Sequence, residues 1–194
     1  MSKSDPASSK NERNKSIRWV VTIFLVTIII SGSISFISDE IMANSSMFVA
    51  FLILLAIVFI GIIFDVIGVA VTSADEKPFH SMAARKVPGA SQAIHLLRNA
   101  ERVSSICNDV VGDICGVVSG SASATIAAQV LHNFTFSWPQ LVTLLMSAFV
   151  AGLTVGGKAI GKSFAINSCT QIVSTVGKLI HWITSVPAFF EKEK

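Results

Sequence analysis

Charged residues are scarce in this chain, and that scarcity narrows its class. Asp, Glu, Lys and Arg make up 14% of the 194 residues, against roughly 25% in soluble domains, whereas hydrophobic residues make up 52%. The mean hydropathy of +0.67 agrees with this balance. The composition excludes an ordinary soluble domain and predicts an all-α integral membrane protein.

Cysteines and catalytic motifs are also few. Cys107 and Cys115 lie eight residues apart on one predicted helix, a separation of about 12 Å, which is too long for a disulfide. Together with Cys169 they do not form a metal-binding spacing, and His80 and His95 are more typical of surface residues than of a metal site. The chain has no H-E-x-x-H motif, no G-x-S-x-G motif and no Ser-Lys pair with supporting residues, so we do not expect an enzyme.

Lys and Arg are absent from two of the connections between apolar stretches. All fifteen fall within residues 3–18, 77–102 and 158–194, and the connections 38–46 and 132–139 contain none. Because basic residues accumulate in cytoplasmic loops, the pattern predicts four spans with both termini in the cytoplasm. The net charge of +3 is then expected to face anionic lipid of a plasma or inner membrane rather than nucleic acid.

The apolar stretches predict four transmembrane helices, at residues 17–37, 47–71, 104–130 and 140–160. A basic segment, residues 1–16, precedes the first, so a signal peptide is the alternative there. The apolar run exceeds the roughly 7 to 15 residues usual for signal peptides, and no clear cleavage site follows. We therefore expect a retained span.

Glycine recurs in the third and fourth predicted spans. Gly112, Gly116 and Gly120 are four residues apart and would let another helix approach one face closely. In the fourth span, Gly152, Gly156 and Gly157 predict a loose or broken helix, of the kind tolerated where the backbone faces protein or a watery cavity.

The segments outside the spans predict surface helices. Residues 75–101 predict two amphipathic helices on the inner membrane surface, separated by Val87-Pro88-Gly89, with Asp75 as a cap and Pro78 in the first turn. An ordinary cytoplasmic loop is the alternative. Residues 166–194 predict an interfacial helix anchored by aromatic side chains; the residues concerned are Lys178, His181, Trp182, Phe189 and Phe190. Two formal glycosylation sequons, Asn44-Ser45-Ser46 and Asn133-Phe134-Thr135, are best explained by chance.

Charged residues within the predicted spans are the candidates for function. A charge at the centre of a membrane helix costs about 2.5 to 3.5 kcal/mol on insertion scales. Asp65 and Asp109 each fall about 8 to 9 Å from the inner end of their spans, and Asp113 shares a helix face with Asp109. With Asn108 they offer the oxygen ligands that Mg²⁺ requires. The alternative is an ion pair of Asp65 or Asp109 with Lys158 that only ties helices together.

Three stretches around these residues are similar to the transmembrane domain of the CNNM/CorC (cyclin M, CorB-like) magnesium-transporter family. Residues 64–73 (FDVIGVAVTS) resemble the family's first-helix pattern, which ends in A-L-T/S-S. Residues 99–112 (NAERVSSICNDVVG) resemble its N-P-E-R-L-L-S-T-I-L-I-G-N stretch. Residues 157–165 (GKAIGKSFA) resemble G-E-x-x-P-K-S-L-A. The resemblance covers residues 47–165 and leaves the span 17–37 as an addition.

The resemblance implies three helices that hold a dehydrated cation in the inner half of the membrane, within a homodimer. By position, Asp65 replaces a family serine, Asn108 and Asp109 fall beside the glycine-asparagine pair, and Gly157 keeps the family's glycine. The family's CBS-pair and C-terminal domains have no counterpart here, so regulation would fall to a separate subunit.

Two departures from the family concern the cation itself. Lys158 stands where the family has glutamate and Gly161 where it has proline, while Lys162 matches. An ammonium about 4 Å from a divalent ion would cost several kcal/mol at an effective dielectric near 20. Lys158 is therefore expected to pair with Asp65 or to occupy the cation's place.

Two functions follow from these expectations. The first is divalent-cation transport or homeostasis, with Mg²⁺ as the ion and with metal ligands Asp65, Asn108, Asp109, Asp113 and Gly157. The second is a non-transporting membrane partner or sensor in which Lys158 replaces the bound cation.

Overall fold

Helices account for nearly all of the chain that the structure describes. The computed structural model describes the backbone of residues 6–43, 45–134 and 137–191, and the side chains of residues 17–18, 20–38, 40–42, 45–134 and 137–185. Within these ranges the elements are α1 (Pro6–Ala43), α2 (Met47–Ser73), α3 (Lys77–Ala84), α4 (Ala90–Arg98), α5 (Ala100–Ser105), the π-helix η1 (Ile106–Gly112), α6 (Asp113–Asn133), α7 (Pro139–Asn167) and α8 (Cys169–Glu191). The described residues include no strand, as the composition predicts.

Four helical segments are long and apolar enough to cross a membrane. They are Val20–Met42, Met47–Ser73, Ala100–Asn133 and Pro139–Asn167, and the third combines α5, η1 and α6. The prediction of an all-helical, multi-pass membrane protein is confirmed to this extent. The sequon residues Asn44 and Thr135, and the side chains of Phe189 and Phe190, lie outside the described part of the chain.

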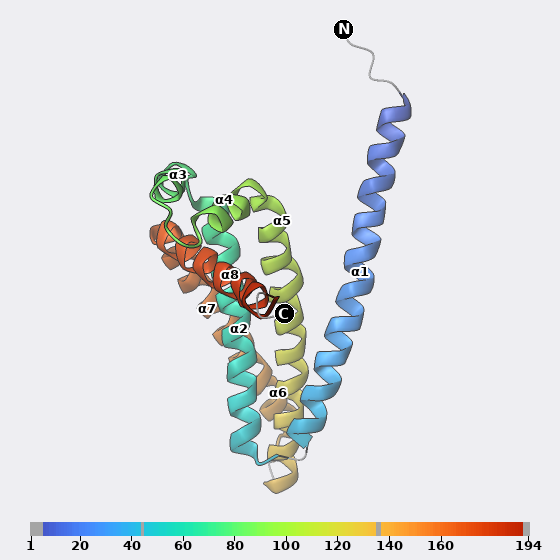
Figure 1. Ribbon diagram of the computed structural model, residues 1–194. Coiled ribbons are helices and arrows are strands. Elements are labelled where there is room, and N and C mark those ends of the chain that lie inside the picture. The colour runs from blue at the N-terminus through green and yellow to red at the C-terminus, as the bar shows by residue number, and fades with distance from the viewer. Residues whose placement is uncertain (1–5, 44, 135–136, 192–194) are drawn as a thin grey trace.

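The three helices α2, α6 and α7 pack together as a bundle, and α1 stands largely apart from it. In Figure 1, α1 meets the bundle near its C-terminal end and diverges from it toward its N-terminus. Phe24 and Ile29 on α1 are 62% and 66% exposed, whereas Met42 is fully buried. At this junction the Gln129 side chain donates a hydrogen bond to the Met42 carbonyl at 2.8 Å.

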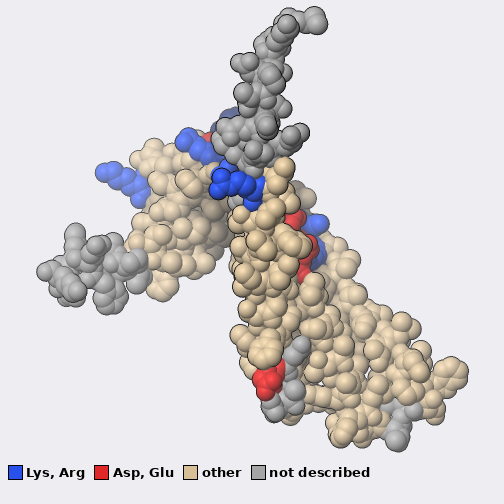
Figure 2. Space-filling model, turned by 90° about the vertical axis from the view of Figure 1, so that its right-hand side faces the viewer, with Lys and Arg blue, Asp and Glu red and all other residues tan. Residues whose placement is uncertain are grey.

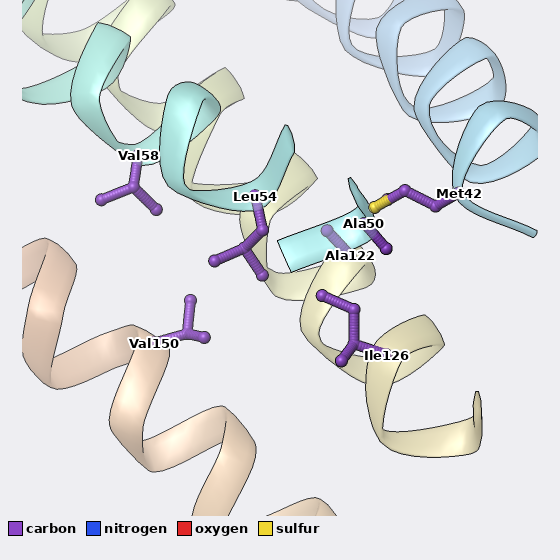
Figure 3. Packing of buried hydrophobic residues seen from close by; sticks show 7 residues of the cluster. All are labelled: Met42, Ala50, Leu54, Val58, Ala122, Ile126 and Val150. Atoms are coloured by element: carbon purple, nitrogen blue, oxygen red, sulfur yellow. The ribbon is translucent and has the colours of Figure 1, made fainter. Parts of the chain in front are cut away.

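Two apolar clusters hold the bundle at different levels. The first, which we call the distal cluster, lies near the two connections that lack Lys and Arg; Figure 3 shows it between α1, α2, α6 and α7. Its buried members are Met42, Ala50, Leu54, Val58, Ala122, Ile126 and Val150. The second, the basic-end cluster, joins the opposite end of α2 to α3, α4, α8 and the C-terminal end of α7. Its buried members are Ala70, Val71, Phe79, Ala93, Leu97, Ala165 and Val173.

The basic residues gather at one end of the molecule. On the face shown in Figure 2, the blue Lys and Arg side chains lie in its upper half, and the lower part of the bundle shows none. The segment at this end forms two helices, α3 and α4, separated at residues 85–89. The N-cap residue of α3 is Glu76, not Asp75 as predicted, but the Asp75 carboxylate accepts a hydrogen bond from the backbone N–H of Lys77, the first residue of the helix, at 3.2 Å.

Glycine at the start of α4 allows α8 to pack closely against it. Gly89 has φ of +85°, a conformation that residues with a side chain rarely adopt. A Cβ added to Gly89 would lie 2.5 Å from the Lys178 backbone nitrogen, and one added to Gly177 would lie 2.6 Å from the Gly89 carbonyl oxygen. The two backbones therefore touch at this crossing.

One prediction about glycine is wrong, and a second is not met within the chain. The fourth span is one unbroken helix, α7, and the irregular turn is instead the π-helix η1 in the third span. The three glycines at four-residue spacing also do not pack as one face against another helix of the chain, because a Cβ at Gly116 or Gly120 would meet nothing within 4 Å. At 3.6 residues per turn, each step of four residues rotates the position by about 40°, which carries the stripe out of the helix contact.

Candidate cation site

Asp65 is a buried carboxylate in the middle of the α2 surface that faces α6 and α7. It is 4% exposed, and its neighbours on the same buried face are Gly61 and Gly68. These positions are three or four residues apart, so they stack along one side of the helix. A charge at such a place needs a compensating partner, because burying an isolated carboxylate is very unfavourable.

The compensating charge comes from α7. The Lys158 Nζ atom lies 3.6 Å from Asp65 Oδ1, and the Lys158 side chain is 23% exposed. This distance makes an ion pair but exceeds the 2.7–3.2 Å of an N–H···O hydrogen bond. Gly112 leaves room for the ammonium, since a Cβ there would lie 3.1 Å from Nζ. The ion pair with Asp65 that the sequence offered as one alternative is confirmed; the pair with Asp109 is not formed.

The π-helix η1 brings Asn108 to the same face of α2. A π-helix holds one more residue per hydrogen-bonded turn than an α-helix, so it changes the direction in which successive side chains point. Asn108 lies against Gly68, and a Cβ at Gly68 would collide with the Asn108 Oδ1 atom. The Asn108 Nδ2 group donates to Ser104 Oγ at 3.1 Å, which orients the amide oxygen toward α2.

Two oxygens at this level are buried and have no hydrogen-bond donor. They are Asp65 Oδ2 and Asn108 Oδ1. Buried acceptors without a partner are uncommon, and each costs about 1 to 3 kcal/mol. Asp65 lies three residues before Gly68 on α2, and Asn108 contacts Gly68 from η1, so both oxygens lie near the same turn of α2. Oxygen acceptors without donors favour a positive charge over an anion.

The other two predicted carboxylate ligands do not join Asp65. Asp109 and Asp113 are exposed on the outer surface of η1 and α6. Asp109 accepts a hydrogen bond from the Ser105 hydroxyl at 2.8 Å. Within the described residues, no three His, Cys, Asp or Glu side chains come together in a way that could hold a metal ion.

Gly157 and Gly161 bring α7 close to α2 beside the site. A Cβ at Gly157 would collide with Ile62, and one at Gly161 would lie 2.7 Å from Val66 Cγ2. The small residues thus set the helix separation that lets Lys158 reach Asp65. A direct ligand role of the Gly157 backbone stays a prediction.

Sequence reasoning did not identify three contributors to the site. Gly68 and Gly112 provide the space for the Asn108 amide and the Lys158 ammonium, and Ser104 orients that amide. The spacing of four between Ser104 and Asn108 could have indicated the hydrogen bond, because such residues are neighbours on a helix. Nothing in the sequence pairs Gly68 with Asn108, which lie forty positions apart.

Comparison with protein-family models, curated proteins and solved structures finds no match for the chain. The residues of the site and their geometry therefore carry the functional proposal.

Proposed function

We propose that the protein transports or regulates a divalent cation, with Mg²⁺ as the first candidate, through a site built on Asp65 and Asn108. The observation that carries the proposal is the pair of buried oxygens, Asp65 Oδ2 and Asn108 Oδ1, that have no donor. A bound cation would satisfy both. Carboxylate and amide oxygens are hard ligands, and Mg²⁺ commonly keeps several waters while binding only one or two carboxylates.

The place of the site in the bundle also supports cation transport. Asp65 lies on a helix that is long and apolar enough to cross a membrane, between the two apolar clusters. An ionisable residue at such depth is a functional candidate because its insertion is costly. The resemblance of residues 47–165 to the CNNM/CorC transmembrane domain also favours Mg²⁺ as the ion. Within this proposal, it further favours a plasma or inner membrane as the location.

The Lys158 ammonium competes with a metal ion for the position beside Asp65. Its ammonium and a metal ion would repel each other by about 4 kcal/mol per pair of unit charges at 4 Å and an effective dielectric of 20. Cation binding at Asp65 therefore requires the Lys158 side chain to move away from the carboxylate. Its partial exposure and its lack of a short hydrogen bond to Asp65 are consistent with such movement.

The second candidate function is a non-transporting membrane partner or sensor. The 3.6 Å ion pair favours it, because Lys158 already supplies a positive charge beside Asp65. In that case the ammonium permanently replaces the metal ion, and the protein contributes a fixed surface to another membrane protein.

Thermal unfolding of the purified protein in detergent tests the proposal. Binding to the folded state at 100 times Kd adds about 2.7 kcal/mol of stability, which raises the Tm of a chain of this size by about 5 to 10 °C. We expect MgCl₂ to produce such a shift in the wild type and not in Asp65→Asn. Asp113→Asn is the matched control, because it removes the same charge from an exposed position.

Flux measurements separate transport from binding alone. Proteoliposomes that contain a Mg²⁺-sensitive dye should report uptake with the wild type and with Asp113→Asn, but not with Asp65→Asn. A wild-type protein whose Tm does not respond to Mg²⁺ would contradict the cation proposal and favour the second candidate; a loss of stability in Lys158→Ala is expected for both candidates, because both keep the ion pair with Asp65.

A homodimer forms part of the proposal. Asp109 and Asp113 are exposed on one surface of the third span, and a carboxylate that faces lipid at this depth is unfavourable. A second copy that covers this surface would remove the carboxylates from lipid, so the molecular mass of Asp109→Asn and Asp113→Asn is measured beside their thermal scans to separate a change of dimer from a change of ion binding. Molecular-mass measurement in detergent distinguishes a dimer from a monomer.

A further inference from the structure

An open apolar groove runs along α2 between the end of α7 and α8. Its volume is about 890 Å³, and ten of its fourteen lining residues are apolar. Phe59 and Ile63 line it from α2, Phe164 from α7, and Leu179 from α8. A volume of this size is typical of small-molecule sites, and the lining excludes a polar ligand as its main occupant.

Close contacts on the far side of α8 keep the groove open. The backbones of Gly89 and Gly177 touch where α4 crosses α8, and Gln92 Nε2 and His181 Nδ1 lie 3.1 Å apart. Val173 is fully buried in the basic-end cluster. Because α8 is held against α4 in this way, its other face lines the groove without closing it.

The groove ends at a positively charged rim. Lys178 and Trp182 line both the groove and a neighbouring hollow, which His181 and Ser185 also line. Among the described residues, no ion pair involves Lys178. A tryptophan next to an apolar surface is typical of the interfacial region of a membrane, where phosphate headgroups lie.

We propose that this groove binds one anionic phospholipid, with its acyl chains along α2 and its phosphate at Lys178. The apolar lining matches the acyl chains, and the unpaired ammonium at the rim matches the phosphate. A multi-pass membrane protein is surrounded by phospholipids, so the proposed ligand is available to the groove in the membrane itself. This inference is independent of the cation proposal, because Asp65 and Asn108 do not line the groove.

Lipid retention through purification tests the proposal. The wild type is exchanged in detergent with phosphatidylglycerol or phosphatidylcholine of the same acyl composition, and bound lipid is counted by native mass spectrometry. We expect one retained phosphatidylglycerol per chain and weaker retention of phosphatidylcholine. Lys178→Gln should reduce the preference for phosphatidylglycerol by about fivefold, which corresponds to about 1 kcal/mol per lysine at an anionic surface.

Two further variants make the result specific. Thr175 is an exposed residue of the groove, so Thr175→Trp should fill the groove and remove both lipids while leaving the Tm in lipid-free detergent unchanged. Lys162→Gln is the control, because Lys162 is exposed and does not line the groove. Equal retention by Thr175→Trp and the wild type would overturn the proposal, as would a lipid-free dimer that Thr175→Trp dissociates or a retained fatty acid in place of the phospholipid.

Discussion

One buried stripe of α2 is packed by opposite means in its two halves. In the distal half, Leu54 and Val58 fill the space between α6 and α7 with apolar side chains. Further along the same stripe, Gly61 and Gly68 flank the buried carboxylate of Asp65. In the distal half every buried residue of the stripe is apolar, whereas in the second half Asp65 Oδ2 and the Asn108 Oδ1 atom that faces the stripe are buried without donors. Gln129 Oε1, on α6 beside Met42, is also buried without a donor, so the contrast lies in the buried carboxylate of the stripe itself. The difference indicates that the first half contributes apolar packing to the bundle, whereas the second half accommodates a buried ion pair.

Lys158→Met should have the largest effect on stability. It leaves the Asp65 carboxylate buried without its partner, which costs about 3 to 5 kcal/mol. The double variant with Asp65→Asn should recover much of this loss, because neither charge then remains. Denaturant unfolding in detergent measures the loss, and Lys162→Met is the control on the same helix. Equal stability of the two lysine variants would show that the ion pair contributes nothing.

Leu54→Ala probes the other half of the stripe. Removal of this fully buried side chain from the distal cluster should cost about 2 to 5 kcal/mol, through lost burial and the cavity that remains. The Tm shift caused by Mg²⁺ should stay that of the wild type, because the two halves act separately. A folded Leu54→Ala protein that no longer responds to Mg²⁺ would show that the two halves of the stripe do not act separately.

Gly68→Ala tests the close approach of Asn108. The added Cβ would collide with the amide oxygen, so we expect a loss of about 1 to 3 kcal/mol and a reduced Mg²⁺ response. Gly120→Ala is the matched control, because its Cβ would meet nothing and alanine favours the helix by about 1 kcal/mol. Thermal unfolding of the pair should therefore give shifts of opposite sign, and shifts of the same sign would contradict the described packing.

Asp109→Asn should have the smallest effect. Its carboxylate is exposed and contacts Ser105, so we expect a stability change within about 0.5 kcal/mol and an unchanged Mg²⁺ response. The measurement is the same pair of thermal scans, with and without MgCl₂. A response lost as fully as in Asp65→Asn would restore Asp109 to the ligand set that the sequence predicts.

The four helices that are long and apolar enough to span a membrane could be predicted from the sequence, because long runs of apolar residues mark them directly. The positions of Asp65 and Asp109 along their helices also follow from counting residues. The direction in which each side chain points does not, because a π-helix interrupts the third span and alters the rotation per residue. Asn108 therefore meets Gly68, while its neighbour Asp109 lies on the outer surface.

The neighbours of the glycines could not be predicted from the sequence either. Gly112, Gly116 and Gly120 suggest a packing face by their spacing, but only Gly112 meets another part of the chain, at Lys158. Gly157, one of the glycines that suggested a broken helix, instead allows the close contact of α7 with Ile62, and Gly161 allows its contact with Val66. Which neighbour fills the space beside a glycine depends on a second helix, and that helix lies far away in the sequence.

The Tm of Lys158→Met, measured with and without MgCl₂, tests the central claim most directly. If the oxygens of Asp65 and Asn108 form a site for one positive charge, a metal ion can take the place that the ammonium leaves. The account predicts a larger Mg²⁺ shift for Lys158→Met than for the wild type, and none once Asp65→Asn is added. A Lys158→Met protein that folds and shows no shift at saturating Mg²⁺ would contradict it.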